Sequence, residues 1–512
     1  MEENRWGKTK TLLLLAALTI TFYITYKVHL TRPYPLHVDE WQHMAMARCT
    51  IEGGRICSVN PYFSDEPALL NLEGGFHAMV SMLSIVGGTD LVRNHRFMPA
   101  LFACISAAIL FAAVIRRNTF LAAFFSAVFM ASVRSNINVL GFMFFTPLTL
   151  AIPLIYALFL TVPEAVAKAR DGFLIASTAV WGGIALIHPP SALILVPATV
   201  LYGVLEWRNV FLHCRFYLKS CAVILLVSSL IFLAAWEYRI KPTYVQSYGI
   251  KNADDFTLLS KLVSFGKKVR HVDIDYDLID FYGRTQAVLA LLGLSIAIRR
   301  REWFTALWPA TMLVWLEVTA ASDTQVLVYY QRMFYYALIS LVPLAGIGAG
   351  TLVGFFDTTL RSDRFKAGAK RGLLLLVVAV AVGYIISSSF ENYFVMHPKA
   401  PLYNIMDESE YLILSKLEQN HGEGNVVYAD KWTSVIVYPV TGNKVVHMVT
   451  ANLWGRDEND LDNAFSKMTC DEKKDFTRRY KVDFMLTRSR LNCTFLKLEG
   501  EEGGDYLYKV NP

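Results

Sequence analysis

Long apolar stretches alternate with short polar connections over most of the chain. A helix that crosses a lipid bilayer needs about 20 predominantly apolar residues, and eleven stretches approach this length, although some are short. They are 11–30, 97–115, 119–133, 139–161, 173–188, 190–206, 218–236, 285–298, 303–320, 334–356 and 372–390. The first stretch is too long for the apolar part of a cleaved signal peptide and lacks a small-residue cleavage site. The pattern predicts a polytopic α-helical membrane protein with about 11 transmembrane helices.

Beyond about residue 400 the apolar runs become short and alternate with polar residues, as in a soluble domain. A helix is expected at 407–419, and further helices near 457–467 and 471–480. The expected strands are 425–429, 433–439, 444–447, 482–487, 493–498 and 505–509. We therefore divide the chain into a transmembrane domain, residues 1–390, and a small α/β domain, residues 391–512. The tail is large enough for its own core, and without a catalytic triad or phosphate loop it is expected to be an accessory or acceptor-facing domain.

Composition and charge agree with this division. The 512 residues are 54% hydrophobic and 18% charged, whereas soluble domains average roughly 45–50% apolar and 25% charged. These values exclude a disordered chain, a collagen and a small disulfide scaffold. Residues 391–512 contain 15 Lys and Arg against 19 Asp and Glu, a net charge of −4. Because the whole chain carries +6, residues 1–390 carry +10. Membrane orientation explains the basic body, so no nucleic-acid partner is expected.

The basic residues predict the orientation in the membrane. Cytoplasmic connections carry an excess of Lys and Arg. With the N-terminus inside, the inside connections contain 18 basic residues, whereas the three short outside connections contain only Arg134 and Arg332. An odd number of helices then places the tail outside. We expect an integral protein of the plasma membrane, or of the endoplasmic reticulum in a eukaryote, with its tail on the extracytoplasmic side.

Two of the segments predicted outside are long, residues 31–96 and 237–284, and long loops in compact proteins usually carry function. In the first, an apolar stretch at 68–87 is interrupted by polar residues. It is too polar for a spanning helix, so we expect an interfacial amphipathic helix that lies on the membrane.

Two adjacent carboxylates mark the beginning of the first long segment. Asp39 and Glu40 stand at the start of a helical stretch at 39–52, and His37 and His43 flank them. An Asp at this position can be a simple helix cap. The concentration of ionisable side chains next to a predicted membrane face favours a functional site.

Four cysteines lie in segments predicted outside the membrane. Cys49 and Cys57 are close together in the first long segment, and Cys470 and Cys493 are both in the tail. Each pair could form a disulfide in an oxidising compartment. The alternative, that all four are free thiols, stays open.

These features together resemble the GT-C superfamily of membrane glycosyltransferases, which use polyprenyl-phosphate-linked sugars as donors. His37-Val38-Asp39-Glu40 is similar to the Asp-Glu pair in the first loop of protein O-mannosyltransferases and their archaeal and bacterial relatives. Arg332 and the aromatic residues after it, with Pro343 further along, are similar to the start of a late span in that superfamily. The chain lacks the Trp-Trp-Asp-Tyr-Gly motif of oligosaccharyltransferase catalytic subunits, which disfavours that branch.

The resemblance implies a hexosyltransferase that moves a sugar, such as mannose, from a polyprenyl (dolichyl-type) phosphate to a hydroxyl of a protein, lipid or glycan acceptor on the outer membrane face. Such enzymes serve protein glycosylation and cell-envelope synthesis. A base must take the acceptor proton, and one carboxylate suffices for a single inverting displacement. We expect Asp39 to be the base, Glu40 to orient the acceptor or tune the pKa of Asp39, and His37 and His43 to contact the acceptor. Adjacent helical residues point about 100° apart, so only one carboxylate should meet the substrate directly.

The leaving phosphate needs cations or hydrogen-bond donors on the same membrane face. Arg332, in a short outside connection, is the leading candidate, although basic residues at the ends of spans also snorkel to lipid headgroups. The weaker candidates at similar heights are Arg96, Arg134 and His188. The basic residues of the second long segment that could cover the phosphate, or simply face solvent, are Lys267, Lys268 and Arg270.

No cofactor is predicted with certainty. A divalent metal held by Asp39, His43 and Glu66 stays an open alternative, but their spacing matches no standard metal signature. A lipid or polysaccharide transporter or flippase is one competing function, and it would place ionisable groups inside the spans, whose centres here are nearly free of them. A ligase that moves a whole glycan chain of the cell envelope is the other, and it would use the same outside site.

Overall fold

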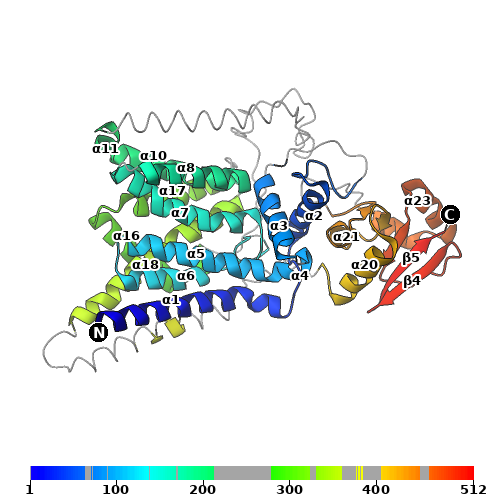
Figure 1. Cartoon of the computed structure of the whole chain (residues 1–512), viewed down its shortest axis with the longest axis horizontal. Coiled ribbons are helices and arrows are strands. Elements are labelled where there is room, and N and C mark those ends of the chain that lie inside the picture. The colour runs from blue at the N-terminus through cyan, green and yellow to red at the C-terminus, as the bar shows by residue number, and fades with distance from the viewer. Residues whose placement is uncertain are drawn as a thin grey trace. The chain divides into compact units, whose positions relative to one another are not determined.

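The computed structural model divides the chain into two compact units (Figure 1). Unit 1 comprises Met1–Leu30, Phe97–Leu233 and Leu258–Pro401, and unit 2 comprises Thr31–Arg96, Ala234–Thr257 and Leu402–Pro512. The structure describes residues 2–63, 71, 73–88, 90–137, 139–168, 171–212, 278–322, 330–359, 376, 379–380, 382–384, 405–449 and 461–511. The predicted span 218–236, most of the span 372–390, and most of the segment 237–284 lie outside the described residues.

Unit 1 is built from helices that lie side by side (Figure 1). Among the described residues, five helices are long and apolar enough to cross a membrane: Lys10–Leu30, Leu91–Ile115, Pro147–Val166, Trp303–Ala321 and Tyr330–Phe355. The helices of unit 1 are α1 (Glu2–Tyr26), α5 (Met98–Ile115), α6 (Phe120–Ala131), α7 (Pro147–Lys168), α8 (Asp171–Ile187), α9 (Pro189–Leu193), α10 (Val196–Leu205), α11 (Trp207–Leu212), α15 (Leu278–Tyr282), α16 (Arg284–Arg299), α17 (Trp303–Ser322) and α18 (Tyr330–Thr359). This is the architecture of an integral membrane protein, while the number of eleven spans stays a prediction.

Glycines let α18 approach two neighbouring helices closely. A Cβ built on Gly348 would lie 2.0 Å from the carbonyl oxygen of Leu289 in α16, and one on Gly293 of α16 would lie 1.9 Å from the carbonyl oxygen of Leu344. On another side, a Cβ on Gly346 would lie 2.6 Å from a backbone nitrogen of α6. Small residues at such contacts are typical of helix pairs in membranes, and they place α18 against both α16 and α6.

Three connections predicted to be cytoplasmic meet in unit 1. The Arg117 guanidinium lies 3.2 Å from the Glu164 carboxylate in the last turns of α7. The Asn118 side chain accepts from Arg300 at 2.8 Å and donates to Glu302 at 3.1 Å. The opposite end of α7 is preceded by Met143, whose carbonyl lies 3.3 Å from a ring nitrogen of His29, just after α1. Connections assigned to one side of the membrane thus contact one another.

Unit 2 contains a five-stranded sheet with the strand order β2-β1-β3-β5-β4. β1 pairs in parallel with β2 and β3, whereas β5 pairs antiparallel with β3 and β4. The strands are β1 (Val426–Tyr428), β2 (Lys444–Val445), β3 (Phe484–Thr487), β4 (Leu496–Glu502) and β5 (Asp505–Val510). The helices of unit 2 are α2 (Val38–Gly53), α3 (Gly74–Gly87), α4 (Leu91–Asn94), α20 (Glu408–His421), α21 (Ser434–Thr441), α22 (Leu461–Lys467) and α23 (Cys470–Tyr480).

The segment before and around α2 shares a hydrophobic core with the tail. Trp41 is fully buried in a cluster that also contains Leu414 of α20, Val427 of β1 and Leu507 of β5. Tyr62 extends the contact, since its hydroxyl donates to the carbonyl of Val435 at 2.8 Å and its own carbonyl accepts from the Val445 amide at 2.9 Å. The first long segment and the tail therefore fold as one body.

The strand expected at 433–439 is wrong, because these residues form α21. Asp430 fixes the turn that leads into the helix: its carboxylate accepts from the amides of Trp432 and Thr433 at 3.0 and 3.2 Å. Gly442 ends it in a left-handed conformation with φ 68°. Every residue of α21 is buried, and a short apolar run buried on all sides has no periodicity that distinguishes helix from strand.

Both cysteine pairs form disulfides. Cys49–Cys57 ties the last turns of α2 to the segment that follows, and Cys470–Cys493 ties the start of α23 to the segment before β4. The apolar stretch at 68–87 contains α3, whose exposed apolar side chains include Met82, Ile85 and Val86. An apolar exposed face is what an interfacial helix would require.

Candidate functional site

The start of α2 separates the two adjacent carboxylates. His37 is the N-cap of the helix, and its Nδ1 accepts from the Asp39 amide at 3.1 Å. The same nitrogen lies 3.6 Å from the Asp39 carboxylate, whose side chain is 27% exposed. The Glu40 side chain, by contrast, is fully buried. Only Asp39 of the pair is open to solvent.

Glu40 fixes the backbone that leads into α2. One of its carboxylate oxygens accepts from the amides of Leu36 and His37 at 2.7 and 2.9 Å. The other oxygen lies 3.3 Å from Nε2 of His95, which is also fully buried. A buried carboxylate is stable only when it is hydrogen-bonded or paired, and these three partners meet that requirement. Glu40 therefore positions the segment that carries Asp39.

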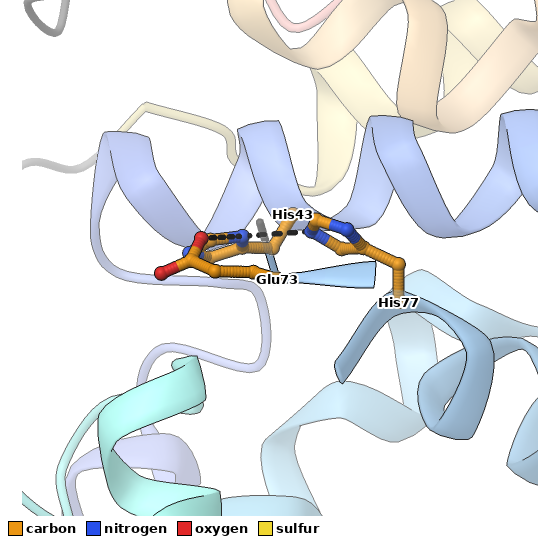
Figure 2. Close-up of side chains that lie close together, drawn as sticks. All are labelled: His43, Glu73 and His77. Atoms are coloured by element: carbon orange, nitrogen blue, oxygen red, sulfur yellow. Dashed lines mark hydrogen bonds and ion pairs between the residues drawn. The ribbon is translucent and has the colours of Figure 1, made fainter. Parts of the chain in front are cut away.

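One turn after Asp39, His43 meets two side chains from α3 and its N-cap (Figure 2). Its Nδ1 lies 3.0 Å from Nε2 of His77 and 3.8 Å from the Glu73 carboxylate. His77 is buried, and burial, followed by the nearby His43 ring, holds the pKa of His77 well below its usual value. The ligand atoms of His43, Glu73 and His77 all lie within 4.8 Å of one another. Two imidazoles and a carboxylate in this arrangement are suitable ligands for a metal ion.

Arg48, further along α2, joins this helix to the tail. Its guanidinium lies 2.6 Å from Glu52, 2.6 Å from Glu418 and 2.7 Å from Glu423. Burial lowers the pKa of Arg48, but the hydrogen bonds to these carboxylates outweigh it and raise the pKa overall. Arg48 lines a pocket of about 320 Å³, but with three carboxylates around it this cation is matched by protein charge and is no candidate for binding phosphate.

The predicted phosphate-binding residues fall in both units. In unit 1, His188 is buried as the N-cap of α9, and its Nδ1 lies 2.7 Å from Ser191 Oγ and 3.2 Å from the hydroxyl of Tyr336. Tyr336 follows Arg332 by one turn on the same face of α18. The connection after α6, which carries Arg134, also reaches α18, where the Phe142 amide donates to the hydroxyl of Tyr335 at 3.3 Å. The structure thus brings His188, Arg332 and the connection of Arg134 to the beginning of α18.

The remaining predicted residues are placed differently. Arg96 belongs to unit 2, directly after His95. Lys267, Lys268 and Arg270 lie outside the described residues, as does Glu66 of the metal set considered from sequence. His43, which the sequence grouped with Asp39 and Glu66 as possible metal ligands, contacts Glu73 and His77 in the structure. One signal in the sequence could have identified this pair, because Glu73 and His77 are four residues apart where the apolar stretch is interrupted. His95 carried no comparable signal.

Comparisons with known proteins show which family and which solved folds this chain resembles. Residues 6–504 match the model of DUF6541, a family of unknown function. A comparison with curated protein sequences finds no match. Among solved structures, ArnT from Cupriavidus metallidurans in the apo state is similar with 14% identity and a TM-score of 0.59, over 99% of this chain and 98% of that one. The form of ArnT bound to undecaprenyl phosphate gives 13% identity and a TM-score of 0.59.

Two further structures are similar. The oligosaccharyltransferase of Archaeoglobus fulgidus has 11% identity and a TM-score of 0.56, over 92% of this chain and 69% of that one. The arabinofuranosyltransferase AftD from Mycobacteria has 12% identity and a TM-score of 0.53, over 98% of this chain and 41% of that one. These neighbours are GT-C glycosyltransferases with polytopic membrane folds, so the likeness supports the membrane fold in general, while the number and orientation of the spans stay predictions. At such low identity it says nothing about a mannosyltransferase-like specificity.

Proposed function

The chain belongs to DUF6541, a family of unknown function, and we propose that it is a glycosyltransferase that moves a sugar from a polyprenyl phosphate to a hydroxyl acceptor. The observation that carries the proposal is the GT-C fold over nearly the whole length of both chains in the comparison with ArnT. One form of that neighbour binds undecaprenyl phosphate, and the archaeal oligosaccharyltransferase AglB was solved with a dolichol-phosphate and an inhibitory peptide. A lipid-linked phosphate is the ligand that these proteins have in common.

Asp39 is the proposed general base. Its carboxylate is partly exposed at the first turn of α2, whereas Glu40 is buried and engaged with Leu36, His37 and His95. A base must reach the acceptor proton within hydrogen-bond distance, so an accessible carboxylate on a rigid helix suits the task. The acceptor oxygen would attack the anomeric carbon as Asp39 takes its proton, and the phosphate would leave with inversion at that carbon. Glu40 acts in this scheme as a positioning residue.

The phosphate is proposed to bind at the beginning of α18. Arg332 supplies the positive charge there, and His188 and Tyr336, which contact each other, supply hydrogen-bonding groups one turn further on. Charge on the leaving phosphate is then stabilised without a general acid. The donor lipid would run along the apolar helices of unit 1. The proposed reaction side is the extracytoplasmic face, as the distribution of basic residues predicts.

The test replaces Asp39 by Asn and measures transfer of labelled sugar from polyprenyl-phosphate donors to an acceptor. The rate should fall by about 10²–10⁴-fold, the usual contribution of a general base. Asp407→Asn is the matched control: Asp407 also starts a helix in unit 2, and Asn is an equally good cap, so this variant should keep the wild-type rate. Wild-type transfer by Asp39→Asn would exclude Asp39 as the base.

The size of the product separates the proposed function from a glycan ligase. A single-sugar transferase increases the acceptor mass by one sugar, whereas a ligase adds a polymer from a lipid-linked glycan. Mass spectrometry of the acceptor after reaction with a monosaccharide donor and, separately, with a lipid-linked oligosaccharide distinguishes them. Transfer of the oligosaccharide alone would overturn the single-sugar proposal.

A further inference from the structure

We propose that His43, Glu73 and His77 bind a divalent transition metal of the zinc class, with three protein ligands and one position open to water or another ligand. The inference does not depend on the proposed transferase activity. Two imidazoles and one carboxylate are a ligand set that zinc uses in sites with an open position. Imidazole also disfavours Mg²⁺ and Ca²⁺, which prefer oxygen ligands.

The geometry is close to that of an occupied site. Metal–nitrogen bonds of about 2.0–2.1 Å at tetrahedral angles place two ligand nitrogens roughly 3.3 Å apart. Nδ1 of His43 and Nε2 of His77 are 3.0 Å apart, and the Glu73 carboxylate is 3.8 Å from the same His43 nitrogen. The three side chains converge from two elements, since His43 is on α2 while Glu73 and His77 are at the start of α3 (Figure 2). All three ligand atoms lie within 4.8 Å of one another, so a rotation of the partly exposed Glu73 side chain toward the two imidazoles would complete the site.

The hydrogen bonds behind His77 fix which of its nitrogens can bind a metal. The Asn71 amide nitrogen donates to the carbonyl of Cys57 at 3.0 Å, so Asn71 Oδ1 is the atom that faces His77. That oxygen also accepts from the Glu73 amide at 3.2 Å. Nδ1 of His77, 3.0 Å away, must therefore carry a hydrogen and donate to Asn71. A neutral His77 then directs the lone pair of Nε2 at His43, which is how metal-binding histidines are commonly oriented by a partner behind the ring.

Two observations distinguish this group from a simple pair of hydrogen-bonded histidines. Glu73 is the N-cap of α3, yet its side chain makes no capping hydrogen bond to the helix. Its carboxylate lies near His43 instead. The support behind His77 is also rigid, because Asn71 is held to Cys57, which is part of the Cys49–Cys57 disulfide. In a metal site we expect both features: a Glu73 carboxylate that faces His43 and does not cap its helix, and a rigid hydrogen-bond partner, Asn71, behind His77.

Bound metal would connect α2 to α3. His43 lies one turn after Asp39 on the same face of α2, so the ion would hold the helix that carries Asp39 against the helix with the exposed apolar face. The open position would take water or an oxygen of a ligand.

The experiment measures metal on the purified full-length protein in detergent, with the affinity tag removed. After treatment with a chelator, the protein is titrated with Zn²⁺ against a chromophoric competitor, and with Co²⁺ while the visible absorption is recorded. We expect one equivalent of Zn²⁺ and the intense Co²⁺ bands of a four-coordinate site. Glu73→Gln and His43→Gln should each weaken binding by at least about 100-fold, and Asn71→Ala by about 10–100-fold, the usual effect of losing the group behind a ligand.

His421→Gln is the matched control. His421 is also in unit 2 and lies 3.8 Å from a carboxylate, that of Glu499, but it is remote in sequence from the group. This variant should bind Zn²⁺ like the wild type. Because Glu73 is partly exposed, Glu73→Gln should fold, and its thermal unfolding without metal verifies this. Wild-type protein that binds no Zn²⁺, or equal binding by wild type and Glu73→Gln, would overturn the proposal, and neither result bears on sugar transfer.

Discussion

Asp39 and Glu40 are neighbours in sequence and have opposite environments. The side chain of Asp39 is 27% exposed to solvent, whereas Glu40 is surrounded by two backbone amides and His95. The rotation of about 100° between adjacent helical positions is sufficient to separate them. The proposed mechanism needs one accessible carboxylate as base and one buried carboxylate that holds the start of α2, and the consecutive residues Asp39 and Glu40 have these two environments.

Stability should depend on Glu40 and not on Asp39. Glu40→Ala leaves the buried amides of Leu36 and His37 without their acceptor, and each buried unsatisfied group costs about 1–3 kcal/mol. We expect Glu40→Ala to lower the free energy of unfolding by about 3 kcal/mol. Glu40→Gln keeps one acceptor oxygen and should lose less. Asp39→Ala removes a favourable helix-end charge, worth about 0.3–1 kcal/mol, and a partly exposed contact with His37. Denaturant unfolding in detergent measures all three, and equal losses for Asp39→Ala and Glu40→Ala would contradict this assignment.

At the scale of residues, local spacing was informative and long-range pairing was not. The carboxylates at the start of a helix and the two flanking histidines could be predicted, because a helix start and its neighbours follow from a few adjacent positions. The partners of these residues could not. His95 meets Glu40 across 55 positions and His77 meets His43 across 34, and nothing local in one sequence specifies such contacts.

At the scale of elements, α18 organises unit 1. Its first two turns carry Arg332 and Tyr336, whose hydroxyl contacts His188, and its middle packs closely on α16 and α6 through glycines. The position of its first turn is thus set by contacts several turns further along. The close packing of the middle of α18 therefore bears on the geometry of the proposed phosphate site.

Gly348→Ala should disrupt this packing. The added Cβ would lie 2.0 Å from the carbonyl oxygen of Leu289, and a backbone atom can move only if the whole helix shifts. Overpacking of this kind typically costs about 1–3 kcal/mol, and we expect the upper part of that range as a lowered melting temperature in detergent. Gly354→Ala is the control on the same helix, because a Cβ added at Gly354 would meet no atom within 4 Å. That variant should be neutral or slightly stabilised, since Ala favours helix over Gly by about 1 kcal/mol. Equal melting temperatures for the two variants would refute the role of Gly348.

Helices and strands were predicted well where the hydrophobic periodicity was clear or where residues that start and end an element were present. The tail helices α20, α22 and α23 and the strands β1, β2, β3 and β5 lie near their expected ranges. The run at 433–439 was predicted as a strand from its β-like sequence, but Asp430, which fixes the turn before α21, and Gly442, which ends the helix, were the better signals. Both belong to the turn chemistry that delimits helices, and tertiary burial on all sides removed the periodicity that would have supported them.

At the scale of the whole molecule, charge separates a basic body from an acidic tail, with +10 and −4 respectively. The sequence allowed this division and the fold class to be predicted, because both are sums over many residues. It did not predict that the segment around α2 shares a core with the tail, since those contacts join residues several hundred positions apart.

The predicted orientation can be measured by cysteine labelling. In a background in which Cys104, Cys214 and Cys221 are Ser, Lys497→Cys places a thiol on the exposed side chain position in β4, and Arg299→Cys places one at the exposed end of α16. A membrane-impermeant maleimide added to intact cells should label Lys497→Cys, and should label Arg299→Cys only after permeabilisation, because the basic connections lie inside. The reverse pattern would invert the topology.

The shared core of unit 2 also has a consequence for the order of events during synthesis. Trp41 emerges from the ribosome early, but its neighbours Leu414, Val427 and Leu507 belong to the last fifth of the chain. The helix that carries Asp39 therefore cannot complete its packing until translation is almost finished and the tail has joined it. A nascent or prematurely terminated chain would leave Trp41 uncovered, so the protein would remain inactive, and open to proteolysis, until its final strand has been made.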